Sequence, residues 1–117
     1  MVKVLVGKKK GGKFQGFFAT FEGEEVSSYE DTREDKKIIC TLYKCTAYDF
    51  DAYRVHVANE SDPANPVYEL HPNSEYSDIQ GLAPNFSEAY RKEELAAEFP
   101  LFLKYVDYFR EQHIDPG

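Results

Sequence analysis

The chain has 117 residues, 42% of them hydrophobic and 30% charged, with nine Tyr, nine Phe and no Trp. This length fits one domain, and this composition is that of a globular protein rather than a disordered one. The net charge of -7 argues against a general nucleic-acid-binding protein, which would carry a basic excess. We therefore expect residues 1–117 to form a single compact domain for which nucleic acid is not a partner.

The charges divide the chain into a short basic segment and a long acidic one. The five charged side chains that precede Glu22 are all lysines, and they lie within residues 1–13. Residues 14–117 contain nine basic and 21 acidic side chains, a net charge of -12. We interpret residues 1–13 as a lysine-rich hairpin that keeps the protein soluble, with anion binding as the alternative. The candidates for anion binding in this segment are Lys8, Lys9, Lys10 and Lys13.

Cysteine placement and the short apolar runs indicate the compartment. The apolar run at residues 2–6 is too short for a signal-peptide core, and we expect neither a secretory signal nor a membrane segment. Cys40 and Cys45 are an odd number of positions apart, so on one strand they would point to opposite faces and could not pair. Reduced thiols favour a cytoplasmic location.

The first third of the chain predicts a hairpin followed by a polar connection. Residues 2–6 are β-branched and apolar and predict a strand, and residues 8–13 contain Gly11-Gly12, a turn signal. Residues 14–21 predict a second strand, with Phe residues at both parities. Residues 23–35 are rich in acidic side chains, and we predict a mobile connection there.

The middle of the chain predicts further strands. Residues 37–46 and 53–57 have apolar side chains at alternate positions, and the second of these shows the clearest half-buried strand pattern. Residues 59–66 have the composition of a loop, and residues 67–70 predict a short edge strand. We expect residues 71–86 to be mostly irregular.

The C-terminal third predicts two helices. Ser87 is a suitable N-cap for a helix over residues 89–98, and Pro100 can begin a second one. In that second helix an apolar stripe with helical spacing should pack on the sheet; it consists of Phe102, Tyr105, Val106 and Phe109. The predicted fold is α+β, an antiparallel sheet of about four to five strands followed by two C-terminal helices packed on one face.

One motif resembles a nucleotide-binding loop in its spacing. Residues 7–13 fit G-x-x-x-x-G-K, but Phe14 stands where that loop needs Ser or Thr to hold magnesium. The loop must also open a helix, and the residues that follow have a strand pattern. We predict that the chain does not bind ATP, and we expect no cofactor.

Other candidates for chemistry are few. Asp49 and Asp51 have a spacing that could suit a divalent cation, but turn chemistry explains them, and we predict no metal site. Arg54 and His56 should project from one strand face, where Tyr43 from a neighbouring strand could join them and bind a phosphate ester. The alternative is the solvent-facing side of a half-buried sheet. No residue is assigned a catalytic role.

The favoured hypothesis is a small, acidic, non-enzymatic interaction module, a regulator or inhibitor of a basic protein partner. Tyrosine supplies interface area at a low entropy cost, and an acidic surface complements a basic one. The candidate protein-binding residues are Tyr29, Tyr48 and Tyr76 in predicted loops, with Glu24, Glu25, Glu30 and Asp31. One alternative is a small phosphoesterase or nucleotide-binding protein that uses the lysines of residues 8–13 with Arg54 and His56. Another is a structural subunit of a homo-oligomer.

Overall fold

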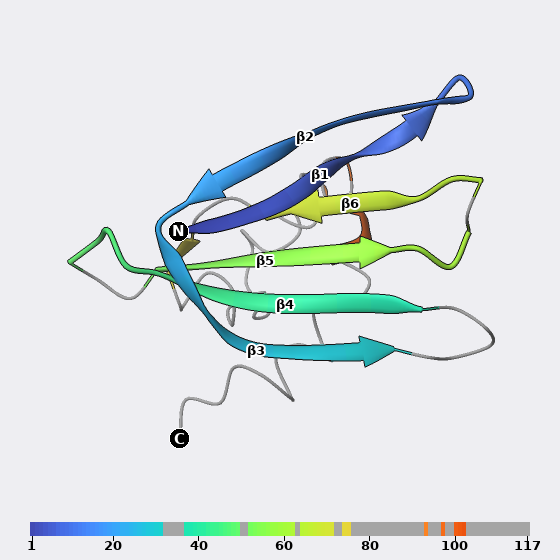
Figure 1. The fold of residues 1–117 in the computed structure, drawn as a ribbon. Coiled ribbons are helices and arrows are strands. Elements are labelled where there is room, and N and C mark those ends of the chain that lie inside the picture. Colours follow the sequence, from blue (N-terminus) through green and yellow to red (C-terminus); the bar gives the residue numbers. More distant parts are fainter. Residues whose placement is uncertain are drawn as a thin grey trace.

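A computed structural model of the chain describes residues 1–31, 37–49, 52–62, 64–71, 74–75, 93, 97 and 100–102. These residues form seven strands in one sheet (Figure 1). The strands are β1 (Val2–Lys10), β2 (Lys13–Phe21), β3 (Gly23–Asp31), β4 (Ile38–Cys45), β5 (Ala52–Asn59), β6 (Val67–Leu70) and β7 (Ser74–Glu75).

The sheet is antiparallel and curled. Its order is β2-β1-β6-β5-β4-β3, with the short β7 paired to β5, so β2 and β3 lie at opposite edges. Only Glu22 separates these two edge strands in the sequence, and its carbonyl oxygen accepts a hydrogen bond from the N–H of Thr46 at 3.2 Å. Figure 1 shows β2 and β3 meeting at this end and separating toward their other ends. A flat sheet could not join its two edges through one residue, so the sheet must curl.

The β1–β2 hairpin has the turn that the sequence predicts. Lys10 pairs with Lys13 across Gly11 and Gly12, whose φ angles of 62° and 83° are those of a type I′ turn. This turn has the twist of the strands that flank it, which explains the regular register over all nine pairs of the hairpin. The prediction that Phe14 lies in a strand, and not in the helix that a phosphate-binding loop would need, is confirmed.

The two central strands carry most of the core. Cys40 pairs with Val57 and Leu42 with Val55 on one face of β4 and β5, and all four side chains are buried. On the other face Cys45 pairs with a fully buried Ala52. The two cysteines therefore lie on opposite faces, as their spacing predicts, and neither is in a disulfide.

The predicted fold class is wrong. The described residues form a mostly antiparallel sheet of seven strands and contain no pair of C-terminal helices; after β7 they comprise only 93, 97 and a helical turn at 100–102. Much of the predicted stripe, Tyr105, Val106 and Phe109, lies outside the described residues, but Phe102 is buried against His71, with ring centroids 4.4 Å apart. Among the described residues no helix is long and apolar enough to cross a membrane.

Two strands were misjudged because of their charge and length. Residues 23–31, predicted as part of a mobile connection, form β3. An edge strand has one side in solvent, so it tolerates acidic side chains that a central strand would exclude. Residues 67–70, predicted as an edge strand, form β6 between β1 and β5. Its contact with β1 is short, because only Gly7 and Lys8 of that strand pair with it.

Candidate functional site

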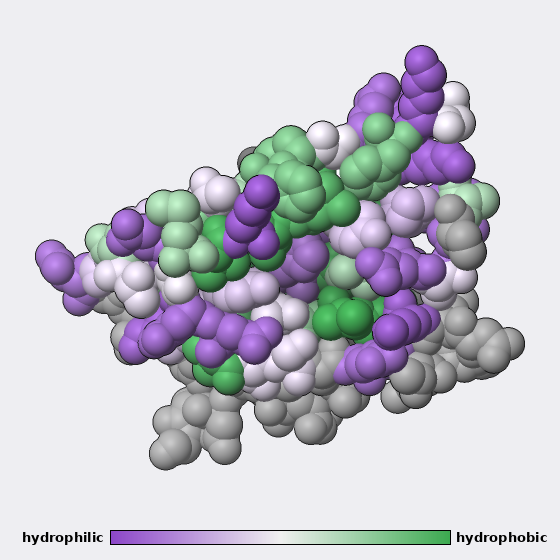
Figure 2. Space-filling model, viewed as in Figure 1, coloured by the Kyte–Doolittle hydropathy of each residue, from purple (hydrophilic) through white to green (hydrophobic). Residues whose placement is uncertain are grey.

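The outer side of β2 is the most apolar exposed edge of the described structure. Three of its phenylalanines are exposed to solvent: Phe14 is 41% exposed, Phe17 62% and Phe18 60%. In Figure 2 apolar side chains gather over β1 and β2, with hydrophilic ones at the hairpin tip. Phe17 and Phe18 are adjacent in the strand, so their rings lie on opposite faces of the sheet. We call these three rings and the free backbone of β2 the aromatic edge.

The backbone of the aromatic edge presents a regular set of hydrogen-bonding groups. Among the described strands, β2 pairs only with β1. In a two-residue hairpin the residues that flank the turn form the first hydrogen-bonded pair, and such pairs alternate along the ladder. Counting from the Lys10–Lys13 pair, we infer that the outward-facing N–H and C=O groups of β2 belong to Phe14, Gly16, Phe18 and Thr20.

Lysines border the aromatic edge. The ammonium group of Lys3 lies 4.6 Å from the centroid of the Phe18 ring, a cation–π contact. The ring of Phe14 meets Tyr68 of β6 edge-to-face, with centroids 5.8 Å apart. Next to this pair lies an open cavity of about 440 Å³; it is lined by Leu5, Lys9, Phe14, Pro66 and Tyr68.

The opposite edge of the sheet is acidic. Four of the predicted protein-binding residues, Glu24, Glu25, Glu30 and Asp31, lie along β3. A β-bulge between Glu25 and Ser27 interrupts the pairing with β4, and Val26 at the bulge is exposed. Charged side chains and a bulge are the usual means by which a sheet edge avoids pairing with another strand. We call this strand the acidic edge; it differs from the aromatic edge in charge and in regularity.

The structure brings Tyr43, Arg54 and His56 together on one face, as the alternation predicts. Tyr43 pairs directly with Arg54, and the Arg54 guanidinium lies 5.0 Å from the centroid of the Phe21 ring. His56 Nε2 is 2.7 Å from the carbonyl oxygen of Leu5, to which it donates a hydrogen bond. Burial lowers the pKa of His56, which favours the neutral ring. The imidazole thus links β5 to β1.

The basic residues proposed for anion binding do not lie at one place. Lys10 and Lys13 flank the hairpin turn, whereas Arg54 lies against Phe21, at the far end of β2. Phe21 lies eight positions after Lys13 along an extended strand, which corresponds to roughly 26 Å. The described structure therefore does not combine the hairpin lysines and Arg54 into one phosphate-sized site.

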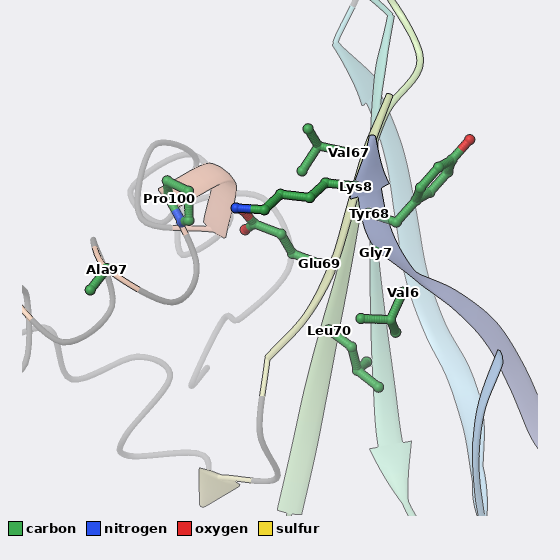
Figure 3. A pocket seen from close by; sticks show the side chains of 9 residues that line it. All are labelled: Val6, Gly7, Lys8, Val67, Tyr68, Glu69, Leu70, Ala97 and Pro100. Carbon is green, nitrogen blue, oxygen red and sulfur yellow. The ribbon is translucent and has the colours of Figure 1, made fainter. Parts of the chain in front are cut away.

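A second cavity, of about 400 Å³, lies between the sheet and the C-terminal helical turn (Figure 3). Lys8 and Glu69 point into the space beside Pro100, while Tyr68 points to the other side of the sheet. The Glu69 carboxylate accepts hydrogen bonds from the N–H groups of Leu101 and Phe102, each at 3.0 Å. Burial raises the pKa of Glu69, against the opposing effects of these hydrogen bonds and of the Lys8 charge. The carboxylate holds the turn in place.

The three candidate tyrosines have different positions. Tyr48 is 48% exposed in the connection between β4 and β5, as predicted. Tyr29 lies in strand β3 and not in a loop, and Tyr76 lies outside the described residues. Among the described residues no group of three His, Cys, Asp or Glu could hold a metal ion.

Sequence reasoning missed the aromatic edge. The signal was the pair Phe17-Phe18, because adjacent strand residues point to opposite faces and both can be buried only in a strand covered on both sides. We compared the chain with protein-family models, curated proteins and solved structures, and none of them matches it. Its function is therefore inferred from its own surface.

Proposed function

We propose that this protein is a non-enzymatic protein-binding module that docks its partner by adding a strand to β2. The observation that carries this proposal is an edge strand of nine residues with three exposed phenylalanine rings. An exposed, regular, apolar edge is a template for another strand, and natural proteins usually protect such edges. The acidic edge has that protection, and the aromatic edge lacks it from Phe14 to Phe21.

Strand addition uses both parts of the aromatic edge. The outward backbone groups of β2 would hydrogen-bond to the added strand, which supplies affinity with little dependence on sequence. Phe17 on one face and Phe18 on the other would pack against its side chains, which supplies specificity. Burial of these rings contributes about 25 cal/mol per Å² of apolar surface removed from water.

The hydrogen bonds of His56 and Glu69 within the protein support a role without catalysis. His56 bonds to the Leu5 carbonyl, and Glu69 bonds to the C-terminal turn, so both have structural tasks. The buried thiols of Cys40 and Cys45, which form no disulfide, support a reducing compartment, and we propose a cytoplasmic location. Turnover of a phosphate ester that depends on His56 would replace this proposal by the enzymatic alternative.

One pair of substitutions at Thr20 tests strand addition. Proline at this position removes an outward-facing N–H while the pairing with β1 is retained, because edge strands accept proline where the N–H faces solvent. Valine at the same position keeps the N–H and favours a strand. Immobilised wild type and Thr20→Val should capture the same protein from an extract of the native host, and Thr20→Pro should lose it. Equal capture by all three would contradict strand addition.

A second candidate function is binding of a basic protein through the acidic edge. Four acidic residues on one strand favour it, and electrostatic attraction should make association slower as salt rises. The test is capture at low and high salt by a variant with Glu24, Glu25, Glu30 and Asp31 replaced by their amides. Loss of a partner in this variant but not in Thr20→Pro would assign the binding to the acidic edge. If capture of the partner changes neither with salt nor in the amide variant, binding through the acidic edge is excluded.

A further inference from the structure

We propose that the strand which β2 binds is β2 of a second copy, in a two-fold symmetric antiparallel dimer centred on Phe17. This inference rests on the proposed role of the aromatic edge and names its occupant. It follows from the register of the outward-facing backbone groups, from the charges at the two ends of β2, and from the lack of charge between them.

The register follows from the alternation of the hairpin. In a symmetric antiparallel pair of β2 strands, the two-fold axis passes between two copies of the same residue, which therefore pair with each other. Every other residue then pairs with the one that lies equally far on the other side of this central residue. If that residue is Phe17, then Phe14 pairs with Thr20 of the second copy and Gly16 with Phe18. All four residues with outward-facing N–H and C=O groups are then matched with one another, and each pair can exchange two hydrogen bonds. A centre at Phe18 would pair Phe14 with Glu22, beyond the end of the strand.

The side chains fit this register. Between Phe14 and Phe21 the strand has no charge, so no like charges meet in the middle of the interface. Phe18 of one copy would lie opposite Gly16 of the other, where the Phe14 ring of that chain occupies the place of a side chain, so the Phe14 and Phe18 rings would meet on this face. Lys13 would lie opposite Phe21, and Glu22 is the next residue of the second copy, so each end of the interface would hold one positive and one negative charge.

The acidic edge does not offer the same fit. Pairing of β3 with β3 of a second copy would place the acidic residues of both chains on adjacent strands, which is unfavourable. The bulge at Val26 would also interrupt the ladder. Self-association should therefore use the aromatic edge and should persist when the acids of β3 are replaced by amides.

Sedimentation velocity over a range of protein concentrations tests the dimer. Wild type and Thr20→Val should form dimers as concentration rises. In Thr20→Pro the dissociation constant should rise about thirtyfold, because the symmetric interface loses the Thr20 N–H twice. Thermal unfolding of both variants verifies that each is folded. A wild type that stays monomeric at all concentrations would overturn the inference, and so would a dimer that Thr20→Pro leaves unchanged.

Cross-linking tests the register independently of the proline variant. At the symmetric centre the two Phe17 Cα atoms should be about 4.5 Å apart, since this would be a non-hydrogen-bonded pair. That separation suits a disulfide, so Phe17→Cys should form a covalent dimer under oxidation. Thr20→Cys is the matched control, because two copies of position 20 would lie roughly 20 Å apart. Cross-linking of Thr20→Cys but not Phe17→Cys would contradict the register.

These results separate the dimer from the general function. A monomeric wild type whose capture of another protein is still lost in Thr20→Pro would leave strand addition standing and exclude the second copy as its occupant. A dimer with the predicted cross-link, together with capture that Thr20→Pro does not affect, would establish the dimer and contradict binding of other proteins at β2.

Discussion

Both carboxylate oxygens of Glu69 lie 3.0 Å from the backbone nitrogen of Leu101. The two residues are 32 positions apart in sequence, so this contact ties the C-terminal helical turn to the central sheet. The N–H of Phe102 donates to the same carboxylate, also at 3.0 Å. The first N–H groups of a helical turn have no partner within it, and a negative charge there is favourable. A residue of β6 thus takes the place of a local N-cap.

We predict that Glu69 makes the protein less stable as pH rises from about 4.5. Its folded pKa is raised above its unfolded value by burial, so the folded state binds more protons between these two values. Stability contributed by the protonated form is therefore lost as pH rises through this window. Glu69→Gln cannot titrate. The free energy of unfolding of this variant, measured by urea titration, should therefore increase relative to that of the wild type as pH rises from 4 to 7. Glu24→Gln, on the exposed edge, is the control; a difference independent of pH would contradict the prediction.

His56 should have the opposite pH dependence. Its pKa is lowered by burial, so the unfolded state binds the proton more readily. Stability from the neutral ring is complete above the unfolded pKa of about 6.5 and is lost as pH falls below it. The imidazole should titrate in NMR spectra with a midpoint below that value. His56→Ala should cost about 1–2 kcal/mol at pH 7, because the Leu5 carbonyl loses its donor. A midpoint at or above 6.5 would show that the ring is not buried.

Gly7 should be far less tolerant of a side chain than Gly12. At Gly7 a Cβ would lie 2.3 Å from the carbonyl oxygen of Gln15 and 2.4 Å from the Cα of Gly16, both backbone atoms, and φ is +149°. Gly7→Ala should therefore destabilise by more than about 2 kcal/mol. At Gly12, with φ at +83°, a Cβ would meet nothing within 4 Å, so Gly12→Ala should cost only about 1 kcal/mol of conformational strain. Equal losses in melting temperature would contradict the contact at Gly7.

Removing the ring of Phe102 should destabilise the protein strongly. The side chain is 2% exposed, so Phe102→Ala should lower the free energy of unfolding by about 3–5 kcal/mol. The matched control is Phe17→Ala, the same substitution at a residue that is 62% exposed, which should change it by about 0.5 kcal/mol or less. Chemical denaturation of the two variants measures the difference. Similar losses would mean that the burial of these two rings has been misassigned.

Local patterns predicted the elements whose signals lie within a few residues. The turn at Gly11 and Gly12 requires positive φ angles, which glycine adopts easily, so the hairpin could be located from the sequence. Residues 53–57 alternate between apolar and polar side chains, so β5 could be located in the same way. The same alternation placed Arg54 and His56 on one face. It could not show that His56 bonds to Leu5, because the two residues are 51 positions apart and meet only in the folded sheet.

The acidic charge of residues 23–31 did not predict that they form a strand. The acidic residues of this segment suggested a mobile connection, because a buried strand would not tolerate them. Whether a strand is central or at an edge depends on the order of all the strands, and that order is a property of the whole sheet. For the same reason the exposure of Phe17 and Phe18 could not be derived from their hydrophobicity, which is equally consistent with a core strand.

The sequence by itself determined the hairpin, its turn, the opposite faces of the two cysteines, and the division into a short basic segment and a long acidic one, because each depends on short-range geometry or on composition. Tertiary structure alone decided that β2 and β3 are edges, that β6 lies between β1 and β5, and that Glu69 reaches the C-terminal turn. These features depend on pairing between segments that are far apart in the sequence, and the order of the strands in the curled sheet determines which segments become neighbours. The aromatic edge belongs to this second group, since its three phenylalanines are exposed only because no further described strand covers them.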